Sequence, residues 1–329
     1  MDLATFAAAV GADGPVTISG LASRGGPVPG VRCVAAPAGI DDIQADEMIV
    51  CCGAGTPVDS LDAALATVGQ RVALPPGGTV GGALALGRSG IRRLGDGPVR
   101  NTLLQARYVS ALGEVVKGGG PTVKNVSGFD ICRLLVGSQG TLGFLGEVIL
   151  RTRPRPATSQ WFSAPAADPW PLFGALHRPT AVLWDGSTVW ALLEGHPDDV
   201  AAQAAGLTPV DGPPPLPPGR TSVAPSALGA LTGTFVAELG VGIVHGDAPA
   251  PDRPHRSGSP SRRPTRGRCS VRCTVRRRCC GTARPCGRCW KVIPPTWPPR
   301  RRHMHSARSP GPHRCRRRTP ASPRPRWAR

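Results

Sequence analysis

The chain of 329 residues lacks any run of 18 apolar residues, which is the shortest run that would indicate a membrane-spanning helix. It also lacks the basic segment that opens a secretory signal. Its first twenty residues, "MDLATFAAAVGADGPVTISG", carry an acidic residue at position 2 and no Lys or Arg. We therefore expect a cytoplasmic protein without a membrane span.

Acidic residues are nearly absent from the C-terminal part of the chain. Residues 252–329 hold 24 Lys and Arg but one acidic residue, whereas residues 1–251 hold 16 basic and 20 acidic residues. The formal net charge of +19 therefore comes from this tail. The tail also lacks apolar periodicity, so it cannot bury enough apolar surface to offset an ordering entropy of about 1–2 kcal/mol per residue. We predict a disordered basic tail over residues 249–329.

Three hypotheses for the tail stay open. Its arginines could bind nucleic-acid phosphates, and Cys269, Cys273, Cys286 and Cys289 could bind zinc. However, the cysteine spacing is irregular and apolar residues are scarce around it. The proportions of Arg, Pro, Cys, His and Trp are all higher in the tail than in the rest of the chain, which is typical of a GC-rich coding sequence translated out of frame. We favour the frameshift, and we therefore predict neither a nucleic-acid partner nor a metal. A frameshift would also cut the second domain short, so a catalytically defective FAD-binding remnant is the alternative function.

Cysteine is sparse before the tail. Cys33, Cys51, Cys52 and Cys132 are the four cysteines of the body, and no Cys/His pairing suggests a metal site there. In a cytoplasmic protein such residues are most simply small apolar residues of the core.

Short apolar runs separated by glycine predict the elements of the first 156 residues. Strands are expected over 15–20, 48–56, 71–78 and 144–154, a hairpin over 103–120 and a short helix over 129–143. A helix over 57–70 would place Leu61, Leu65 and Val68 on one face and end at Gly69. Another helix begins at "TVGGALAL", with Thr79 as its N-cap.

The pattern changes after Pro156. Residues 180–195 alternate apolar and polar positions around "DGS", which predicts an antiparallel hairpin. A helix over 196–207 and a second hairpin over 234–246 follow. We therefore predict a second, antiparallel unit over residues 157–248.

Glycine clusters at four junctions: "SGLASRGG" at 19–26, "PPGGTVGG" at 75–82, "RSGIRRLGDG" at 88–97 and "VGSQGTLG" at 136–143. Main-chain N–H groups in such loops can bind phosphate, and a Cβ would keep the phosphate away from them. No Walker lysine motif and no convincing G-x-G-x-x-G unit is present. From the residues alone, a dinucleotide held by several loops and a merely turn-rich α/β fold stay open.

Residues 15–156 resemble the FAD-binding domain of the vanillyl-alcohol oxidase and para-cresol methylhydroxylase (PCMH) superfamily, and especially the FAD-binding subunit of glycolate oxidase. The resemblance rests on "CGAGTPVDSLDAALATVGQ", "LPPGGTVGGALALGRSGIRRLGDGPVRN", "GGPTVKNVSGFDICRLLVGSQGTLG" and "GEVILRTRP". It implies an α+β protein: a PCMH-type FAD-binding domain of two α/β subdomains over 1–156, then an incomplete antiparallel α+β cap or substrate domain over 157–248.

The resemblance also implies which residues bind FAD. The first loop lacks the family's usual "GGGT", and "LGDG" lacks the aromatic residue that often precedes its last glycine. Lys124, Asn125 and Asp130 match a signature that we interpret as a structural turn. The implied FAD-binding residues are Gly20, Arg24, Gly25, Gly26, Pro76, Gly77, Gly78, Thr79, Val80, Gly81, Gly82, Ser89, Gly90, Gly97, Gly140, Gly143, Glu147, Val148 and Ile149.

The flavin is expected to be bound non-covalently. Many members of the superfamily attach FAD through a histidine, but His177 is the first histidine of this chain and lies beyond the implied flavin domain. A histidyl link within residues 1–156 is therefore excluded.

The resemblance implies an FAD-dependent oxidoreductase that acts on the CH–OH group of a small 2-hydroxy acid, or a subunit that relays its electrons. A sister flavin subunit and an iron–sulfur subunit are the partners that the glycolate oxidase analogy suggests. Oxidation of a hydroxy acid needs a cation for the carboxylate and a base for the hydroxyl proton. His177, Arg178, His196 and His245 are the candidates in the second unit, and the sequence assigns the catalytic role to none of them.

Overall fold

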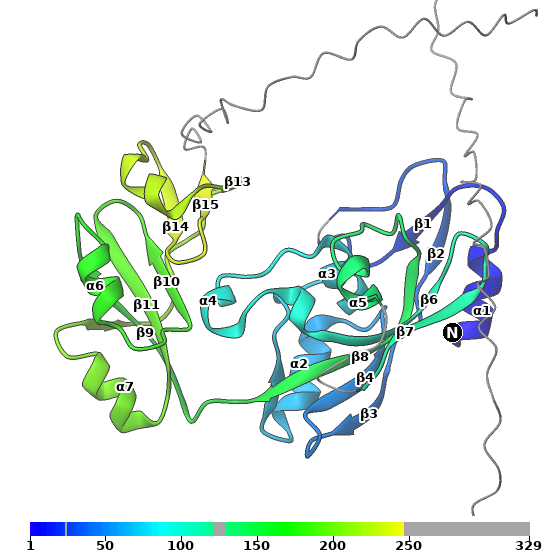
Figure 1. The fold of residues 1–329 in the computed structure, drawn as a ribbon, viewed down its shortest axis with the longest axis horizontal. Helices are drawn as coiled ribbons and strands as arrows, with labels where there is room; N and C mark the ends of the chain where they lie inside the picture. Colours follow the sequence, from blue (N-terminus) through cyan, green and yellow to red (C-terminus); the bar gives the residue numbers. More distant parts are fainter. Residues whose placement is uncertain (24, 122–128, 247–329) are drawn as a thin grey trace, which may run out of the picture. The chain divides into compact units, whose positions relative to one another are not determined.

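The computed structural model describes residues 1–23, 25–121 and 129–246 (Figure 1). The basic tail lies outside these residues, as do Arg24, Lys124 and Asn125 of the sequence predictions. The described residues belong to one compact unit. None of their helices has the length and apolar character needed to cross a membrane.

The N-terminal part is built around a six-stranded antiparallel sheet. Its strand order is β3-β4-β8-β6-β7, and β5 also pairs with β8. The eleven-residue strand β8 pairs with both β4 and β6. The predicted strands at 48–56 and 144–154 and the hairpin over 103–120 are present. The short strand predicted to run into a loop at 71–78 is also present, as β5, which ends at Val72. The strands are β3 (Ile40–Gln44), β4 (Ile49–Gly53), β5 (Gln70–Val72), β6 (Leu103–Val109), β7 (Val115–Gly119) and β8 (Phe144–Pro154).

Five short helical segments accompany this sheet, and a core of buried aliphatic side chains joins several of them to it. Thr79 is the N-cap of α3, as predicted, because its hydroxyl accepts the N–H of Gly82 at 3.1 Å. The segments are α2 (Val58–Ala66), α3 (Val80–Leu86), α4 (Arg93–Asp96), the 3-10 helix η1 (Val99–Asn101) and α5 (Ile131–Leu135).

The predicted apolar face of α2 is correct at two of its three positions. Leu61 and Leu65 are fully buried, but Val68 is 43% exposed. The helix ends at Ala66, and the chain then turns through Gly69 with φ +68°. Val68 therefore no longer follows the helical spacing that would have placed it in the core.

Because Val68 is exposed while Leu61 and Leu65 are buried, substitution of Val68 should cost less free energy of unfolding than substitution of either leucine. Val68→Ser should change the free energy of unfolding by no more than about 0.5 kcal/mol, as is usual for surface positions. Thermal melting of the purified variant checks this value. A loss comparable to that of truncating a buried leucine, about 2–5 kcal/mol, would show that Val68 packs in the core.

A smaller layer lies beside the first sheet. Strands β1 (Val16–Ser19) and β2 (Arg32–Ala35) pair in parallel, and β1 was predicted. Helix α1 (Leu3–Val10) was not, although Asp2 caps it by accepting the N–H of Thr5 at 2.7 Å. A third apolar cluster fixes this layer to the end of β6, formed by Leu3, Phe6, Val10, Val34 and Val109.

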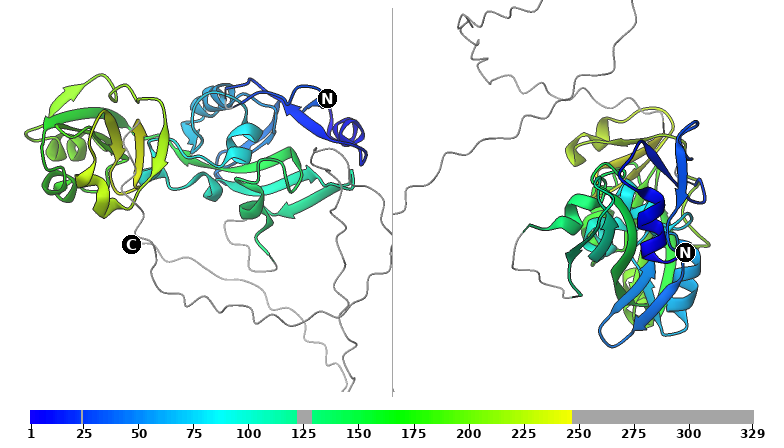
Figure 2. Two further views of the ribbon diagram at one scale, coloured as in Figure 1. Left: turned by 90° about the horizontal axis from the view of Figure 1, so that it is seen from above. Right: turned by 90° about the vertical axis from the view of Figure 1, so that its right-hand side faces the viewer.

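Residues after Pro156 form a seven-stranded sheet in the order β12-β9-β11-β10-β14-β15-β13, seen from two further directions in Figure 2. All of its pairs are antiparallel. Both predicted hairpins, β10–β11 and β14–β15, are present. The elements are β9 (Thr158–Pro165), α6 (Trp170–Ala175), β10 (Ala181–Trp184), β11 (Thr188–Gly195), α7 (Pro197–Gln203), β12 (Thr208–Val210), β13 (Arg220–Ser222), the 3-10 helix η2 (Pro225–Ala230), β14 (Phe235–Glu238) and β15 (Ile243–Gly246).

The two faces of this sheet differ in chemistry. Val182, Leu193, Ala237 and Val244 contribute to the apolar core on one face. Because side chains alternate along a strand, their neighbours Glu194, Glu238 and His245 point to the other face. That face carries the charged groups described below.

The four body cysteines do not share one environment. Cys52 and Cys132 are buried, as predicted, and burial raises their thiol pKa values to about 12 and about 11. Cys51 is half-buried and Cys33 is exposed. The prediction of core cysteines is therefore wrong for these two, because each lies in a strand at a position that faces away from the apolar core.

Candidate functional site

The loop over residues 75–82 is shaped to present main-chain amides. Gly77 and Gly78 have φ +73° and +68°, values that residues with a Cβ rarely adopt. The N–H of Gly77 donates to Asp59 Oδ1 at 3.0 Å, and the N–H groups of Val80 and Gly81 donate to main-chain carbonyls of 54–56. Among the described residues, no acceptor within hydrogen-bond distance is found for the N–H groups of Gly78 and Thr79.

These two amides fit a phosphate-bearing cofactor. Gly78 is buried, and a buried N–H without an acceptor is costly. Among the described residues, an ideal Cβ at Gly77 would meet nothing within 4 Å. A diphosphate oxygen would be a suitable acceptor for the two amides, for which the described part of the chain supplies none.

Three of the four glycine-rich loops meet around α3. A Cβ on Gly20 would lie 3.5 Å from Thr79 Oγ1, and a Cβ on Gly90 would lie 3.6 Å from Pro75 Cβ. The fourth loop joins the other end of α3, where the N–H groups of Gly137 and Gln139 donate to the carbonyls of Leu84 and Ala85. Segments far apart in the sequence are thus brought together as the resemblance implies.

Other predicted residues lie away from this junction. Gly25 and Gly26 are exposed, with nothing within 4 Å of a Cβ. A Cβ on Gly140 would meet Phe144, and one on Gly143 would meet Tyr108. Their contacts with a cofactor stay a prediction.

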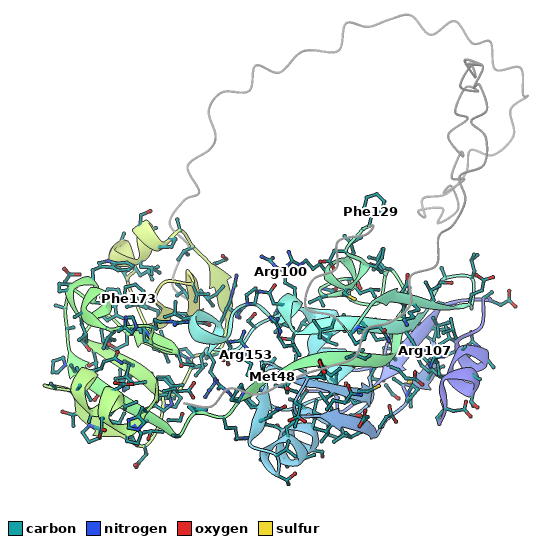
Figure 3. All side chains as sticks on the ribbon, turned by 60° about the horizontal axis from the view of Figure 1, so that its bottom comes forward. Met48, Arg100, Arg107, Phe129, Arg153 and Phe173 are labelled. Atoms are coloured by element: carbon teal, nitrogen blue, oxygen red, sulfur yellow. The ribbon has the colours of Figure 1, made fainter. Side chains whose placement is uncertain are left out.

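The three residues of β8 that were predicted to bind FAD make contacts within the sheet in this structure. Glu147 pairs with Arg107, which is labelled in Figure 3, at 2.6 Å. The side chain of Val148 is buried in the core, and Ile149 pairs with Cys51 and Gln105 on the neighbouring strands. A direct role in FAD binding for these residues also stays a prediction.

The segment 88–97 borders a cavity of about 480 Å³. Four predicted FAD residues line it: Pro76, Ser89, Gly90 and Gly97. Trp161, Leu192 and Glu194 of the second sheet also line it. Ser89 has a structural role as well, because its hydroxyl accepts the N–H of Val99 at 3.1 Å.

One charged cluster borders this cavity. Arg71 and Arg92 each pair with both Asp96 and Glu194. Burial raises the pKa of the Asp96 carboxyl, although Arg92 and Arg153 lower it. Arg153, labelled in Figure 3, donates to the main-chain carbonyl of Asp96 at 2.6 Å. The sequence analysis missed this cluster, and only the i,i+4 spacing of Arg92 and Asp96 could have indicated part of it.

A second cluster lies on the same face of the seven-stranded sheet. Glu238 is 2% exposed and its Oε1 lies 2.8 Å from His245 Nε2, while its Oε2 has no hydrogen-bond partner in the part of the chain that the structure describes. Arg220 lies opposite His245 in the β13–β15 ladder, and its Nη2 donates to the carbonyl of Ser89 at 3.4 Å. This contact joins the sheet to the predicted flavin segment.

The guanidinium of Arg220 lies among charges of both signs. Burial lowers the pKa of its guanidinium, Glu238 raises it, and the like charges of Arg88 and Arg93 lower it again. Arginine still stays protonated, so the second cluster holds a cation beside the carboxylate of Glu238.

The four candidates that the sequence offered for binding the substrate carboxylate or accepting its hydroxyl proton lie in different environments. His177 and Arg178 are exposed, and Arg178 has φ +50° in a turn. His196 is exposed and caps α7 through the N–H of Asp198. His245 alone of the four belongs to the second charged cluster. No group of three or more metal-ligating side chains occurs in the described parts of the chain.

Comparison with known proteins gives a consistent result. Residues 34–119 match the family described as FAD binding domain. The chain is 37% identical over 157 residues to glycolate oxidase subunit GlcE of Escherichia coli, covering 44% of each protein. It is 38% identical over 117 residues to a D-lactate dehydrogenase of Archaeoglobus fulgidus, covering 35% of this chain and 26% of that protein. It is also 38% identical over 82 residues to glycolate oxidase subunit GlcD of Bacillus subtilis, covering 25% and 17%.

The matched region therefore spans less than half the length of these curated relatives. Among solved structures, alkyldihydroxyacetonephosphate synthase aligns with a TM-score of 0.47 and 15% identity, over 58% of this chain and 47% of that one. The predicted flavin cofactor is confirmed by the family match and these relatives. The chain therefore contains an FAD binding domain over residues 34–119 and is similar to FAD-linked oxidoreductases such as the glycolate oxidase subunits.

Proposed function

We propose that this chain binds FAD non-covalently and oxidises a small 2-hydroxy acid to the 2-oxo acid, or relays the electrons from that oxidation. Glycolate oxidase subunits and D-lactate dehydrogenases among its relatives support this substrate class. Bound FAD would accept the substrate's hydrogen as hydride, and the protein supplies binding, orientation and proton transfer. The location in the cytoplasm stays a prediction.

The amides of Gly78 and Thr79 are proposed to hold the diphosphate, with the loops at 20–26 and 88–97 around the rest of the cofactor. Supporting this, Gly77 and Gly78 have φ +73° and +68°, and among the described residues no acceptor is found for the N–H groups of Gly78 and Thr79. No histidine precedes His177 in this sequence, so a histidyl link is excluded there and the proposal is that hydrogen bonds and packing provide the affinity.

The observation that carries the substrate proposal is the Arg220–Glu238–His245 cluster beside the carbonyl of Ser89. Arg220, assisted by Arg88 and Arg93, would bind the carboxylate. Glu238 orients the imidazole by accepting the Nε2 hydrogen, which leaves Nδ1 of His245 to accept the hydroxyl proton. Removal of that proton would leave the hydrogen on the hydroxyl-bearing carbon to be given up as hydride, and FAD, when bound, would supply the two-electron acceptor.

The proposal is tested by mixing the FAD-loaded chain anaerobically with glycolate or D-lactate. Bleaching of the visible flavin absorbance, followed by reduction of a dye acceptor, is the expected result. Acetate, which has no hydroxyl group, is the matched control and should leave the flavin oxidised. A folded, yellow protein that no 2-hydroxy acid bleaches would overturn direct oxidation.

Relay of electrons is the second candidate, favoured by relatives that are named as oxidase subunits. In that case the isolated chain would not react with hydroxy acids. Its flavin would instead be reduced by a reduced flavoprotein partner and reoxidised by an iron–sulfur protein. Addition of such a partner together with substrate should restore bleaching.

A further inference from the structure

Glu194, on β11, accepts hydrogen bonds from four side chains. Its Oε2 accepts from Arg71 at 3.0 Å and from Thr180 Oγ1 at 2.8 Å. Its Oε1 accepts from Ser159 Oγ at 2.8 Å and from Arg92 Nη2. The side chain is only 7% exposed. Both oxygens are thus fully used, which is the condition for a buried carboxylate to be stable.

Asp96, on α4 of the N-terminal part, pairs with the same two arginines as Glu194. Arg71 Nη2 lies 3.0 Å from its Oδ1, and Arg92 Nε lies 3.3 Å from its Oδ2. Arg71 and Arg92 therefore each bridge one carboxylate of the first part to one of the seven-stranded sheet. Four ion pairs share four residues, so removal of one member affects the others.

The network is located where the segment 88–97 rests on β10. The N–H of Gly95 donates to the carbonyl of Thr180 at 3.0 Å, and a Cβ on Gly95 would lie 2.8 Å from Thr180 Cα. This segment carries Ser89, Gly90 and Gly97 of the predicted FAD site. It also carries Arg88 and Arg93, whose charges act on Arg220.

We propose that Glu194 is a positioning residue: it locks the segment 88–97 onto β10 and β11, so that the flavin-side loop and the anion-binding face of the sheet keep a fixed spacing. The functional half of this inference rests on the proposed function, whereas the structural half does not. Without the Glu194 carboxylate, Asp96 alone would balance the two guanidinium groups in a partly buried space, and neither arginine would reach the seven-stranded sheet through an ion pair with Glu194. The segment would then detach from the sheet more often.

Hydrogen exchange of the full chain without added substrate tests the structural half. In Glu194→Ala, peptides over 89–97 and 180–195 should exchange at least about tenfold faster, which corresponds to about 1.4 kcal/mol of lost protection. Peptides of β4 and β8 should not change. Asp62→Asn is the matched control, because it removes a carboxylate paired with Arg155 at 2.6 Å on the surface.

Unchanged exchange over 89–97 in Glu194→Ala would overturn the lock. Should that variant fail to fold, Ser159→Ala and Thr180→Val each remove one neutral donor and should give a smaller acceleration in the same peptides. No acceleration in either of these variants would also overturn it.

Steady-state kinetics of the FAD-loaded chain test the functional half. Glu194→Ala should lower kcat/KM at least about tenfold while FAD stays bound. Faster exchange with unchanged kcat and KM would overturn the positioning role. If the wild-type chain oxidises no 2-hydroxy acid, the proposed function fails, but the exchange result still decides the lock.

Discussion

Replacing His245 with alanine is expected to lower kcat for 2-hydroxy acid oxidation by about 10²–10⁴-fold, the usual contribution of a general base. The imidazole is held by Glu238 at 2.8 Å and lies opposite Arg220 in the sheet. The substrate carboxylate on Arg220 would bring its hydroxyl group toward Nδ1. Stopped-flow bleaching of the flavin measures this step directly.

Two variants control this result. His196→Ala removes an exposed histidine outside the cluster and should leave kcat unchanged. Glu238→Gln keeps the size of the side chain but weakens the orientation of the imidazole, so its loss of kcat should be smaller than that of His245→Ala. A His245→Ala protein that keeps FAD and the wild-type kcat would show that the base lies elsewhere.

The local part of this fold could be predicted from the sequence because its signals are local. Thr79 precedes an apolar helical run, and a hydroxyl at that place caps the helix. The "DGS" turn lies between alternating runs and gives the β10–β11 hairpin. Helix α1 was missed although Asp2 offered a cap. Val68 was misplaced because helical spacing was extended two residues past Ala66, where the helix ends.

The charged clusters could not be predicted in the same way. Arg71 and Glu194 are 123 residues apart in the chain, and Arg220 and Ser89 are 131 apart. Neither pair follows a helical or strand period. Arg220 lies on β13, a strand of only three residues that joins the edge of the seven-stranded sheet. Such short strands form through their neighbours, so propensity gives little signal for them.

The FAD site was predicted by family resemblance more than by geometry. The sequence indicated amides in four loops, and the structure shows which amides of the second loop already have acceptors within the protein. Gly77, Val80, Gly81 and Gly82 use their N–H groups to fix the loop. Among the described residues no acceptor is found for the N–H groups of Gly78 and Thr79, the two amides that we propose for the diphosphate. Sequence alone cannot make this division, because it depends on carbonyls of residues 54–56 across the sheet.

Gly81→Ala is expected to weaken FAD binding by about 5–150-fold, which corresponds to about 1–3 kcal/mol of overpacking. A Cβ at this position would lie 2.9 Å from both the Cβ and the carbonyl oxygen of Ala54. Ala54 O also accepts the N–H of Gly81 at 2.7 Å. The loop would have to move away from β4, and the amides of Gly78 and Thr79 would move with it.

This change in FAD affinity is measured by titrating the chain with FAD and recording the quenching of flavin fluorescence. Gly174→Ala is the matched control, since a Cβ there meets nothing within 4 Å and FAD affinity should be unchanged. Gly81 lies outside the strand ladders of the sheet, so the variant should still fold and its circular dichroism should resemble the wild type. Wild-type affinity in a folded Gly81→Ala protein would mean that the diphosphate does not depend on this loop. The amides of Gly78 and Thr79 would then need another explanation.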